Sequence, residues 1–135
     1  MSFKNFKTLV VDDMATIGMI IRSMLEEIGF RDIEYAENGR LAWEKIEKAH
    51  GEKTPYRFIV SDWNMPEMNG LALLKKIKNI DSSKKIHFLM VAAESEYNKT
   101  HTLLKEGASD VIVKPFSCQA FNDKIYELFK PFNSI

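Results

Sequence analysis

The fold is decided by short stretches such as Thr8-Leu9-Val10-Val11 and Phe58-Ile59-Val60, in which apolar residues follow one another instead of alternating with polar ones. Continuous apolarity is typical of strands that are covered on both faces, as the strands of a parallel sheet are. The chain has five such stretches, at 8–11, 33–36, 58–61, 88–92 and 111–113. They predict five strands of a parallel sheet.

A stretch with helical periodicity follows each predicted strand. After the first strand, apolar residues recur three and four positions apart from Met14 to Ile28, and Gly29 is a typical helix stop. The same spacing predicts four more helices, at 41–49, 71–80, 96–106 and 118–130, the last of them closed by Pro131. Strand and helix alternate five times, which predicts a doubly wound α/β fold, a three-layer sandwich with one central sheet.

Size and composition indicate one ordinary domain. The chain has 135 residues, and its 19 basic and 19 acidic side chains cancel, whereas a general binder of nucleic acid or of anionic membranes needs a basic excess. The single cysteine, Cys118, excludes an internal disulfide framework and a multi-thiolate zinc site. No apolar run approaches the roughly 18 residues of a membrane-spanning helix. The first residues are not followed by an apolar segment and a small-residue cleavage site, so we expect no secretory signal. We therefore expect one domain, residues 1–135, in the cytoplasm.

Charged residues follow three of the predicted strands where each strand ends. Asp12 and Asp13 follow the first strand, Asp62 follows the third and Lys114 follows the fifth. The carboxyl ends of parallel strands meet at one edge of the sheet, where ligands bind. Carboxylates a few ångströms apart repel one another unless a hard divalent cation neutralises them, and an all-oxygen site suits Mg²⁺. A lysine opposite them adds a second positive group, as phosphoryl transfer requires.

Each of these residues also has a purely structural interpretation. Acidic residues that follow strands often cap helices, and Asp12 or Asp13 could cap the helix that begins near Met14. One residue alone does not decide between the two interpretations. Four charged groups at the ends of three strands favour a functional site.

The sequence around these positions resembles a known family. The signature of two-component receiver domains is matched by Val10-Val11-Asp12-Asp13, Ser61-Asp62-Trp63-Asn64-Met65-Pro66, Asn69-Gly70 and Val113-Lys114-Pro115-Phe116. The resemblance covers essentially the whole chain and is strongest to the single-domain chemotaxis response regulators of the CheY type. It implies a flavodoxin-like (βα)5 fold with strand order 2-1-3-4-5.

The resemblance also implies a role for each residue of the site. Asp62 would accept a phosphoryl group from a histidine kinase as an acyl phosphate. Asp13 and Asp62 would bind Mg²⁺ directly, while Asp12 would act through a water molecule and Asn64 through its backbone carbonyl. Lys114 would contact the phosphoryl oxygens, and the peptide bond to the proline that follows it would be cis.

Two positions depart from the family pattern. Receivers usually place Thr or Ser at the end of the fourth strand, where the hydroxyl bonds the phosphoryl group, and this chain has Ala92. Alignment on Lys114 puts Val111 where CheY-like regulators carry an aromatic switch residue. The loss of one hydrogen bond to a charged oxygen forfeits about 1.5–3 kcal/mol. We expect phosphorylation to persist with a weakened link to conformational change.

The lifetime of the phosphoryl group depends on two further positions. The residues two beyond Asp62 and two beyond Ala92 are Asn64 and Glu94, which are polar and acidic as in CheY-like regulators. They would position an attacking water, which predicts fast self-dephosphorylation.

Partners are expected to bind the face built from the fourth helix, the fifth strand and the fifth helix, as in CheY-like proteins. Here that face would include Tyr97, Leu104, Val113, Phe116 and Lys124. The resemblance implies a chemotaxis-type histidine kinase as one partner, and a flagellar motor switch protein or a phosphatase as another. We expect a monomer without an output domain.

Three other functions compete with this switch. The missing Thr and aromatic residue make a phosphate sink, or an unconventional receiver with weakened switching, an alternative. A Mg²⁺-dependent phosphatase with an aspartyl-phosphate intermediate would place a second carboxylate two residues after its nucleophile, where this chain has Asn64. A flavodoxin-like cofactor carrier would need a phosphate-binding loop after the first strand, where Asp12 and Asp13 would repel the phosphate of FMN. We therefore expect a phosphoacceptor that releases its own phosphoryl group rather than an enzyme.

Overall fold

A computed structural model describes residues 3–80 and 85–130 of the chain. Its strands are β1 (Thr8–Val11), β2 (Ile33–Ala36), β3 (Phe58–Asp62), β4 (His87–Ala93) and β5 (Asp110–Lys114). They form one parallel sheet in the order β2-β1-β3-β4-β5. The predicted (βα)5 fold and its strand order are confirmed.

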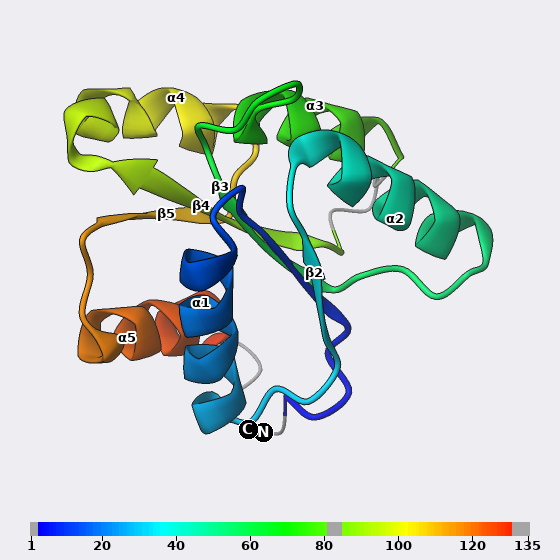
Figure 1. Ribbon diagram of the computed structural model, residues 1–135, viewed down its shortest axis with the longest axis horizontal. Coiled ribbons are helices and arrows are strands. Elements are labelled where there is room, and N and C mark those ends of the chain that lie inside the picture. The colour runs from blue at the N-terminus through cyan, green and yellow to red at the C-terminus, as the bar shows by residue number, and fades with distance from the viewer. Residues whose placement is uncertain (1–2, 81–84, 131–135) are drawn as a thin grey trace.

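Helices cover both faces of the sheet. They are α1 (Ala15–Ile28), α2 (Gly39–Gly51), α3 (Gly70–Ile80), α4 (Thr100–Lys105) and α5 (Cys118–Leu128), with a 3₁₀ helix, η1 (Glu94–Lys99), before α4. Figure 1 shows α1 and α5 on one side of the sheet and α2, α3 and α4 on the other. The three-layer arrangement is therefore confirmed.

The two layers of helices explain the continuous apolarity of the strands. In β1, Leu9 belongs to the hydrophobic cluster beneath α2 and α3, and its neighbour Val10 belongs to the cluster beneath α1 and α5. Ile59 and Val60 divide between the same two clusters in β3. Consecutive side chains point to opposite faces of a sheet, so a strand with helices on both faces needs apolar residues at every position.

Several element boundaries differ from the prediction. The single helix predicted at 96–106 is wrong: a 3₁₀ helix begins at Glu94, and the α-helix runs only from Thr100 to Lys105. The Glu96 carboxylate accepts a hydrogen bond from the Ala93 N–H, which fixes the start of this segment two residues before the predicted one. At the other end Gly107, with φ 111°, stops the helix.

Smaller differences affect two other helices. The second helix begins at Gly39 rather than Leu41, because the Asn38 side chain accepts the Leu41 N–H at 2.8 Å and caps an earlier turn. The last helix ends at Leu128 rather than at residue 130. Pro131, which was predicted to close it, lies outside the described residues.

Across residues 3–80 and 85–130, no helix combines the length and apolarity needed to cross a bilayer.

Candidate functional site

Three carboxylates from two neighbouring strands meet at the carboxyl edge of the sheet. Asp12 and Asp13 directly follow β1, Asp62 ends β3, and these two strands are paired. One carboxylate oxygen from each of the three residues lies within 4.8 Å of the other two. The structure therefore brings together the three acidic residues that the sequence places at strand ends.

Asp12 is the most deeply buried of the three, with 1% of its surface exposed. Its Oδ1 accepts the Met14 N–H at 2.9 Å, but Met14 is itself the N-cap residue of α1 and no side chain caps this helix, so the predicted capping by Asp12 or Asp13 is wrong. Its Oδ2 is buried and has no hydrogen-bond partner among the described residues. An unsatisfied buried carboxylate oxygen is costly. The Met14 N–H therefore accounts for one oxygen of Asp12, and the other oxygen is available to a ligand.

Burial also changes the acidity of Asp12. Desolvation raises the pKa of its carboxyl from 3.8 to about 6, the Met14 N–H opposes that rise, and the nearby charge of Asp62 adds to it. A bound proton or cation would offset the free-energy cost of burying the charged Asp12 carboxylate. The donor set of carboxylate oxygens and the orphaned Oδ2 both fit a hard divalent cation such as Mg²⁺.

Asp62 is also buried, with 6% of its surface exposed, and both of its side-chain hydrogen bonds reach the same oxygen. Oδ1 accepts the Trp63 N–H at 2.9 Å and the Lys114 Nζ at 3.3 Å. Burial raises the pKa of the Asp62 carboxyl, while the Lys114 ammonium opposes the rise. Oδ2 receives no hydrogen bond from the described residues, so one oxygen of Asp62 is held and the other is unbonded.

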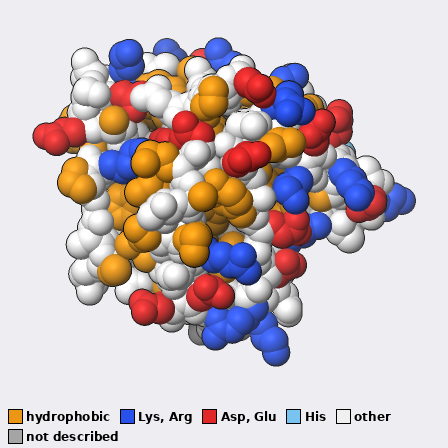
Figure 2. All heavy atoms as spheres, viewed as in Figure 1, with side chains coloured by type: hydrophobic (Ala, Val, Ile, Leu, Met, Phe, Trp, Pro, Cys, Tyr) orange, Lys and Arg blue, Asp and Glu red, His pale blue; other side chains and the backbone are white. Residues whose placement is uncertain are grey.

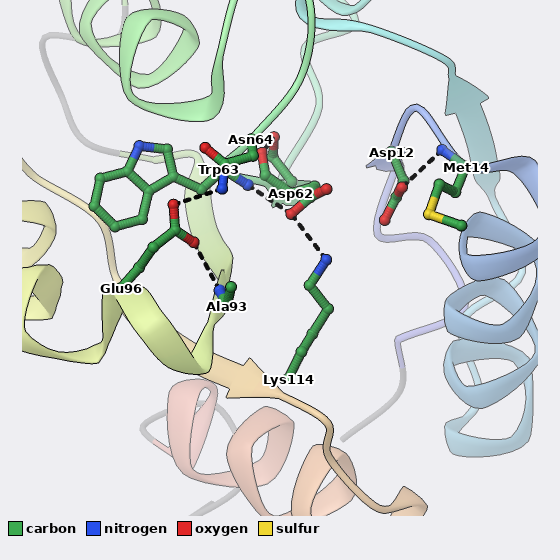
Figure 3. Close-up of polar contacts among 9 residues, drawn as sticks. Asp12, Met14, Asp62, Trp63, Asn64, Ala93, Glu96 and Lys114 are labelled. Atoms are coloured by element: carbon green, nitrogen blue, oxygen red, sulfur yellow. Dashed lines mark hydrogen bonds and ion pairs between the residues drawn. The ribbon is translucent and has the colours of Figure 1, made fainter.

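Lys114 reaches the site from the far side of β4. It ends β5, pairs with Ala93 of β4 and extends its side chain past the end of that strand to Asp62, as Figure 3 shows. The peptide bond between Lys114 and Pro115 is cis, as the resemblance implied.

The two positions that depart from the family pattern are buried in apolar surroundings. Ala92, at the end of β4, is fully buried, and Val111 of β5 is 8% exposed. Both belong to the hydrophobic cluster beneath α2 and α3. Neither side chain offers a hydrogen-bond donor to this edge of the sheet.

Asn64 is bound by a residue that the sequence interpretation missed. Its Nδ2 donates to Glu96 Oε2 at 2.7 Å, and Glu96 Oε1 accepts the Ala93 N–H at 2.7 Å, so one carboxylate bridges the ends of β3 and β4 (Figure 3). Glu94, by contrast, has an exposed side chain. A glutamate three residues after a helix start is a known capping signal and could have identified Glu96.

The residues predicted for the partner face fall into two kinds. Tyr97 of η1 is 67% exposed and Leu104 of α4 is 45% exposed. The other three are less available to a partner. Val113 is half-buried in β5, the ring of Phe116 stacks on that of Phe121 with 5.6 Å between the ring centres, and Lys124 Nζ lies 3.3 Å from Asp110 Oδ2. Figure 2 shows that hydrophobic side chains reach the surface across the middle of one face, bordered by charged ones.

Comparison with known proteins agrees with this geometry. Residues 8–126 match the response regulator receiver domain family. Chemotaxis protein CheY1 of Helicobacter pylori is 40% identical over 119 residues, which cover 88% of this chain and 93% of that protein. Chemotaxis protein CheY-3 of Vibrio cholerae is 33% identical over 127 residues, which cover 94% of each.

A solved structure extends the likeness. A chain of the CheX–CheY–BeF₃–Mg²⁺ complex from Borrelia burgdorferi superposes with a TM-score of 0.81 at 25% identity, over 92% of this chain and 89% of that one. The sheet order, the acidic edge and the match over most of the chain lead to one conclusion: this chain belongs to the response regulator receiver domain family.

Proposed function

We propose that this protein accepts a phosphoryl group from a histidine kinase on Asp62, with Mg²⁺, and signals by binding other proteins in the control of chemotaxis. The observation that carries the proposal is the cluster of Asp12, Asp13 and Asp62 beside the Lys114 ammonium. Similarity to two chemotaxis proteins along most of the chain supports the assignment to chemotaxis.

In the proposed transfer, the unbonded Oδ2 of Asp62 attacks the phosphorus of a phosphohistidine. A P–O bond forms as the P–N bond breaks, and the histidine nitrogen leaves with the bonding electrons and takes up a proton. Lys114 already lies 3.3 Å from the other oxygen of Asp62, so its charge is in place to contact the incoming phosphoryl oxygens. The Trp63 N–H holds the carboxylate plane during the attack.

The residues that would hold Mg²⁺ are the three clustered aspartates, with Asn64 contributing its backbone carbonyl as the family resemblance implies. The buried and unpartnered Oδ2 of Asp12 supports this assignment. When bound, the cation neutralises charge on the carboxylates and on the phosphoryl oxygens.

Loss of the phosphoryl group is proposed to occur on the protein itself. A water molecule attacks the phosphorus, the P–O bond to Asp62 breaks, and inorganic phosphate leaves as the carboxylate is regenerated. Asn64 and Glu94 are the residues proposed to position that water. Because Asn64 is an amide and cannot shuttle a proton, we propose a phosphoacceptor rather than a phosphatase acting on other substrates.

A second candidate function is a phosphate sink. The apolar burial of Ala92 and Val111 favours it, since the usual hydroxyl and aromatic switch are both absent from these positions. A sink would take phosphoryl groups from the kinase and release them without a large change in partner affinity. If the protein signals instead, as in the first proposal, its proposed binding partner is a flagellar motor switch protein or a phosphatase.

The phosphoacceptor role can be tested with acetyl phosphate and Mg²⁺. Intact-mass measurement should detect one added phosphoryl group on the wild-type protein and none on Asp62→Asn. Trp63 should report the same event by fluorescence, measured in a Trp43→Phe background so that it is the remaining tryptophan. Unchanged mass and unchanged emission of the wild-type protein would contradict the proposal.

A further inference from the structure

Glu96 makes a contact that the proposed phosphoryl transfer does not require. Its two carboxylate oxygens accept separate hydrogen bonds at 2.7 Å, one from the Ala93 N–H and one from the Asn64 side-chain amide. One negatively charged group therefore occupies two donors that come from the ends of neighbouring strands. The inference below rests on the proposed phosphorylation of Asp62.

Both donors, the Ala93 N–H and the Asn64 amide, lie near the end of β3, where Asp62 is. The Val91 carbonyl accepts the Trp63 N–H and so points from β4 toward the end of β3. Backbone groups alternate in direction along a strand, so the Ala93 N–H, two residues further, points the same way. Asn64 is two residues beyond Asp62. A group attached to Asp62 would thus emerge beside two donors that Glu96 already occupies.

We propose that Glu96 is a positioning residue that acts as an anion latch: it holds Ala93 and Asn64 in the resting protein, and the phosphoryl group on Asp62 displaces it. A phosphorylated side chain carries about −1.5 to −2 charges and strong acceptor oxygens, so it competes for both donors and repels the glutamate. Asn64 then becomes free to contact the phosphoryl group or its attacking water.

Displacement of Glu96 would also change the proposed partner face, because Glu96 belongs to η1. Glu96 is the third residue of η1, and its bond to the Ala93 N–H is the side-chain hydrogen bond that caps the start of this short helix. The next residue, Tyr97, is 67% exposed. Loss of the cap loosens η1 and with it the placement of Tyr97. Glu96 would in this way provide the link that Ala92, without a hydroxyl, does not.

The first test measures hydrogen exchange of residues 94–99 in the wild-type protein. Beryllofluoride with Mg²⁺ serves as the mimic of the phosphoryl group. Exchange in η1 should increase when the mimic binds, and the side-chain amide resonance of Asn64 should shift. In Glu96→Ala, exchange should be high from the start and should not increase further. An η1 that keeps its exchange rate when the mimic binds to the wild-type protein overturns the latch.

The second test measures the affinity for beryllofluoride in the presence of Mg²⁺. Glu96→Gln keeps the size of the side chain and an acceptor for Ala93 but removes the charge. Displacement should become easier, and the mimic should bind about tenfold more tightly, the difference between a charged and a neutral acceptor. Glu106→Gln, a half-buried glutamate at the far end of α4, makes the same charge change and should leave the affinity as in the wild type.

The outcomes separate the latch from the function on which it rests. If the wild-type protein binds the mimic and gains a phosphoryl group from acetyl phosphate, but Glu96→Gln binds the mimic no more tightly, the latch is wrong and the function stands. If the wild-type protein does neither, the proposed function fails and the latch fails with it.

Discussion

The Nζ of Lys114 lies 3.3 Å from Oδ1 of Asp62, although β4 separates the strands that these two residues end. The lysine crosses the end of that strand and places one positive charge beside a buried carboxylate. The pair brings a positive charge from β5 to the carboxylates that lie at the ends of β1 and β3.

Lys114→Met is expected to slow phosphorylation of Asp62 by acetyl phosphate about tenfold to a hundredfold. This factor corresponds to the free energy of one hydrogen bond to a charged group, about 1.5–3 kcal/mol. The substitution keeps the apolar stem and removes the charge, so the pKa of Asp62 should also rise further. The time course of intact mass measures the rate. Lys105→Met, which removes an exposed lysine at the end of α4, is the matched control, and equal rates for the two variants would contradict the role.

The raised pKa of Asp12 predicts a protein that is more stable in mild acid when no divalent cation is present. The pKa is about 6 in the folded protein against an ordinary value of 3.8, so the folded state binds this proton more tightly than the unfolded chain. The free energy of unfolding should therefore rise as the pH falls from 7 toward 4, by at most about 3 kcal/mol from this group. Asp62 shifts in the same direction.

Urea unfolding in the presence of a chelator, at pH 7 and at pH 5, measures this effect. Asp12→Asn should be more stable than the wild-type protein at pH 7, since the buried charge is gone, and should show less of the acid stabilisation. It should also lose stabilisation by added Mg²⁺. A variant that is less stable than the wild type at pH 7 with the chelator present would show that the burial cost has been misassigned.

Tyr35 supports the acidic loop from the neighbouring strand. Its hydroxyl donates to the backbone carbonyl of Asp12, and its ring lies so close to Gly18 that a Cβ there would be 2.5 Å from a ring carbon. Tyr35→Phe should cost about 1 kcal/mol of stability. Because the loop that carries Asp12 and Asp13 loses an anchor, Mg²⁺ should also bind more weakly.

Calorimetric titration with Mg²⁺ separates the two effects of that substitution. Tyr56→Phe is the matched control, because it removes a hydroxyl that donates to Glu34 at 3.0 Å, and neither residue belongs to the clustered carboxylates. This control should lose stability and keep its Mg²⁺ affinity. Equal Mg²⁺ affinities for Tyr35→Phe and the wild type would remove Tyr35 from the support of the site.

The placement of the aspartates could be predicted from the sequence because it depends on strand periodicity alone. Continuous apolar runs identify parallel strands, and the carboxyl ends of such strands share an edge, so residues that directly follow Val11 and Ser61 meet there. Neither step requires knowledge of a contact between distant side chains.

The role of Glu96 could not be predicted in the same way, because it depends on such a contact. Asn64 is 32 residues away in the sequence, and the carboxylate meets it only once β3 and β4 are paired. Helical spacing predicts one helix over residues 96–106, whereas the hydrogen bond from the Ala93 N–H to Glu96 caps a 3₁₀ helix that begins at Glu94. Only the contact with Asn64 is beyond what helical periodicity can predict; the hydrogen bond from the Ala93 N–H is local and matches a capping signal that the helix prediction did not use.

Ala92→Thr is expected to restore a hydroxyl at the carboxyl end of β4 and to have opposite effects on stability and on ligand affinity. Ala92 is fully buried in the cluster beneath α2 and α3, so the larger polar side chain should lower the free energy of unfolding by about 1–3 kcal/mol. The hydroxyl, next to Ala93 at the edge, should donate to the oxyanion mimic and tighten beryllofluoride binding by about tenfold or more.

Ala92→Val separates volume from hydrogen bonding, because valine has nearly the shape of threonine and no hydroxyl. Its stability loss in urea should resemble that of Ala92→Thr, whereas its affinity for beryllofluoride with Mg²⁺ should stay at or below that of the wild type. If threonine and valine bind the mimic equally well, the end of β4 does not contact the phosphoryl group in this protein. In that case alanine at position 92 cannot be the cause of a weakened switch.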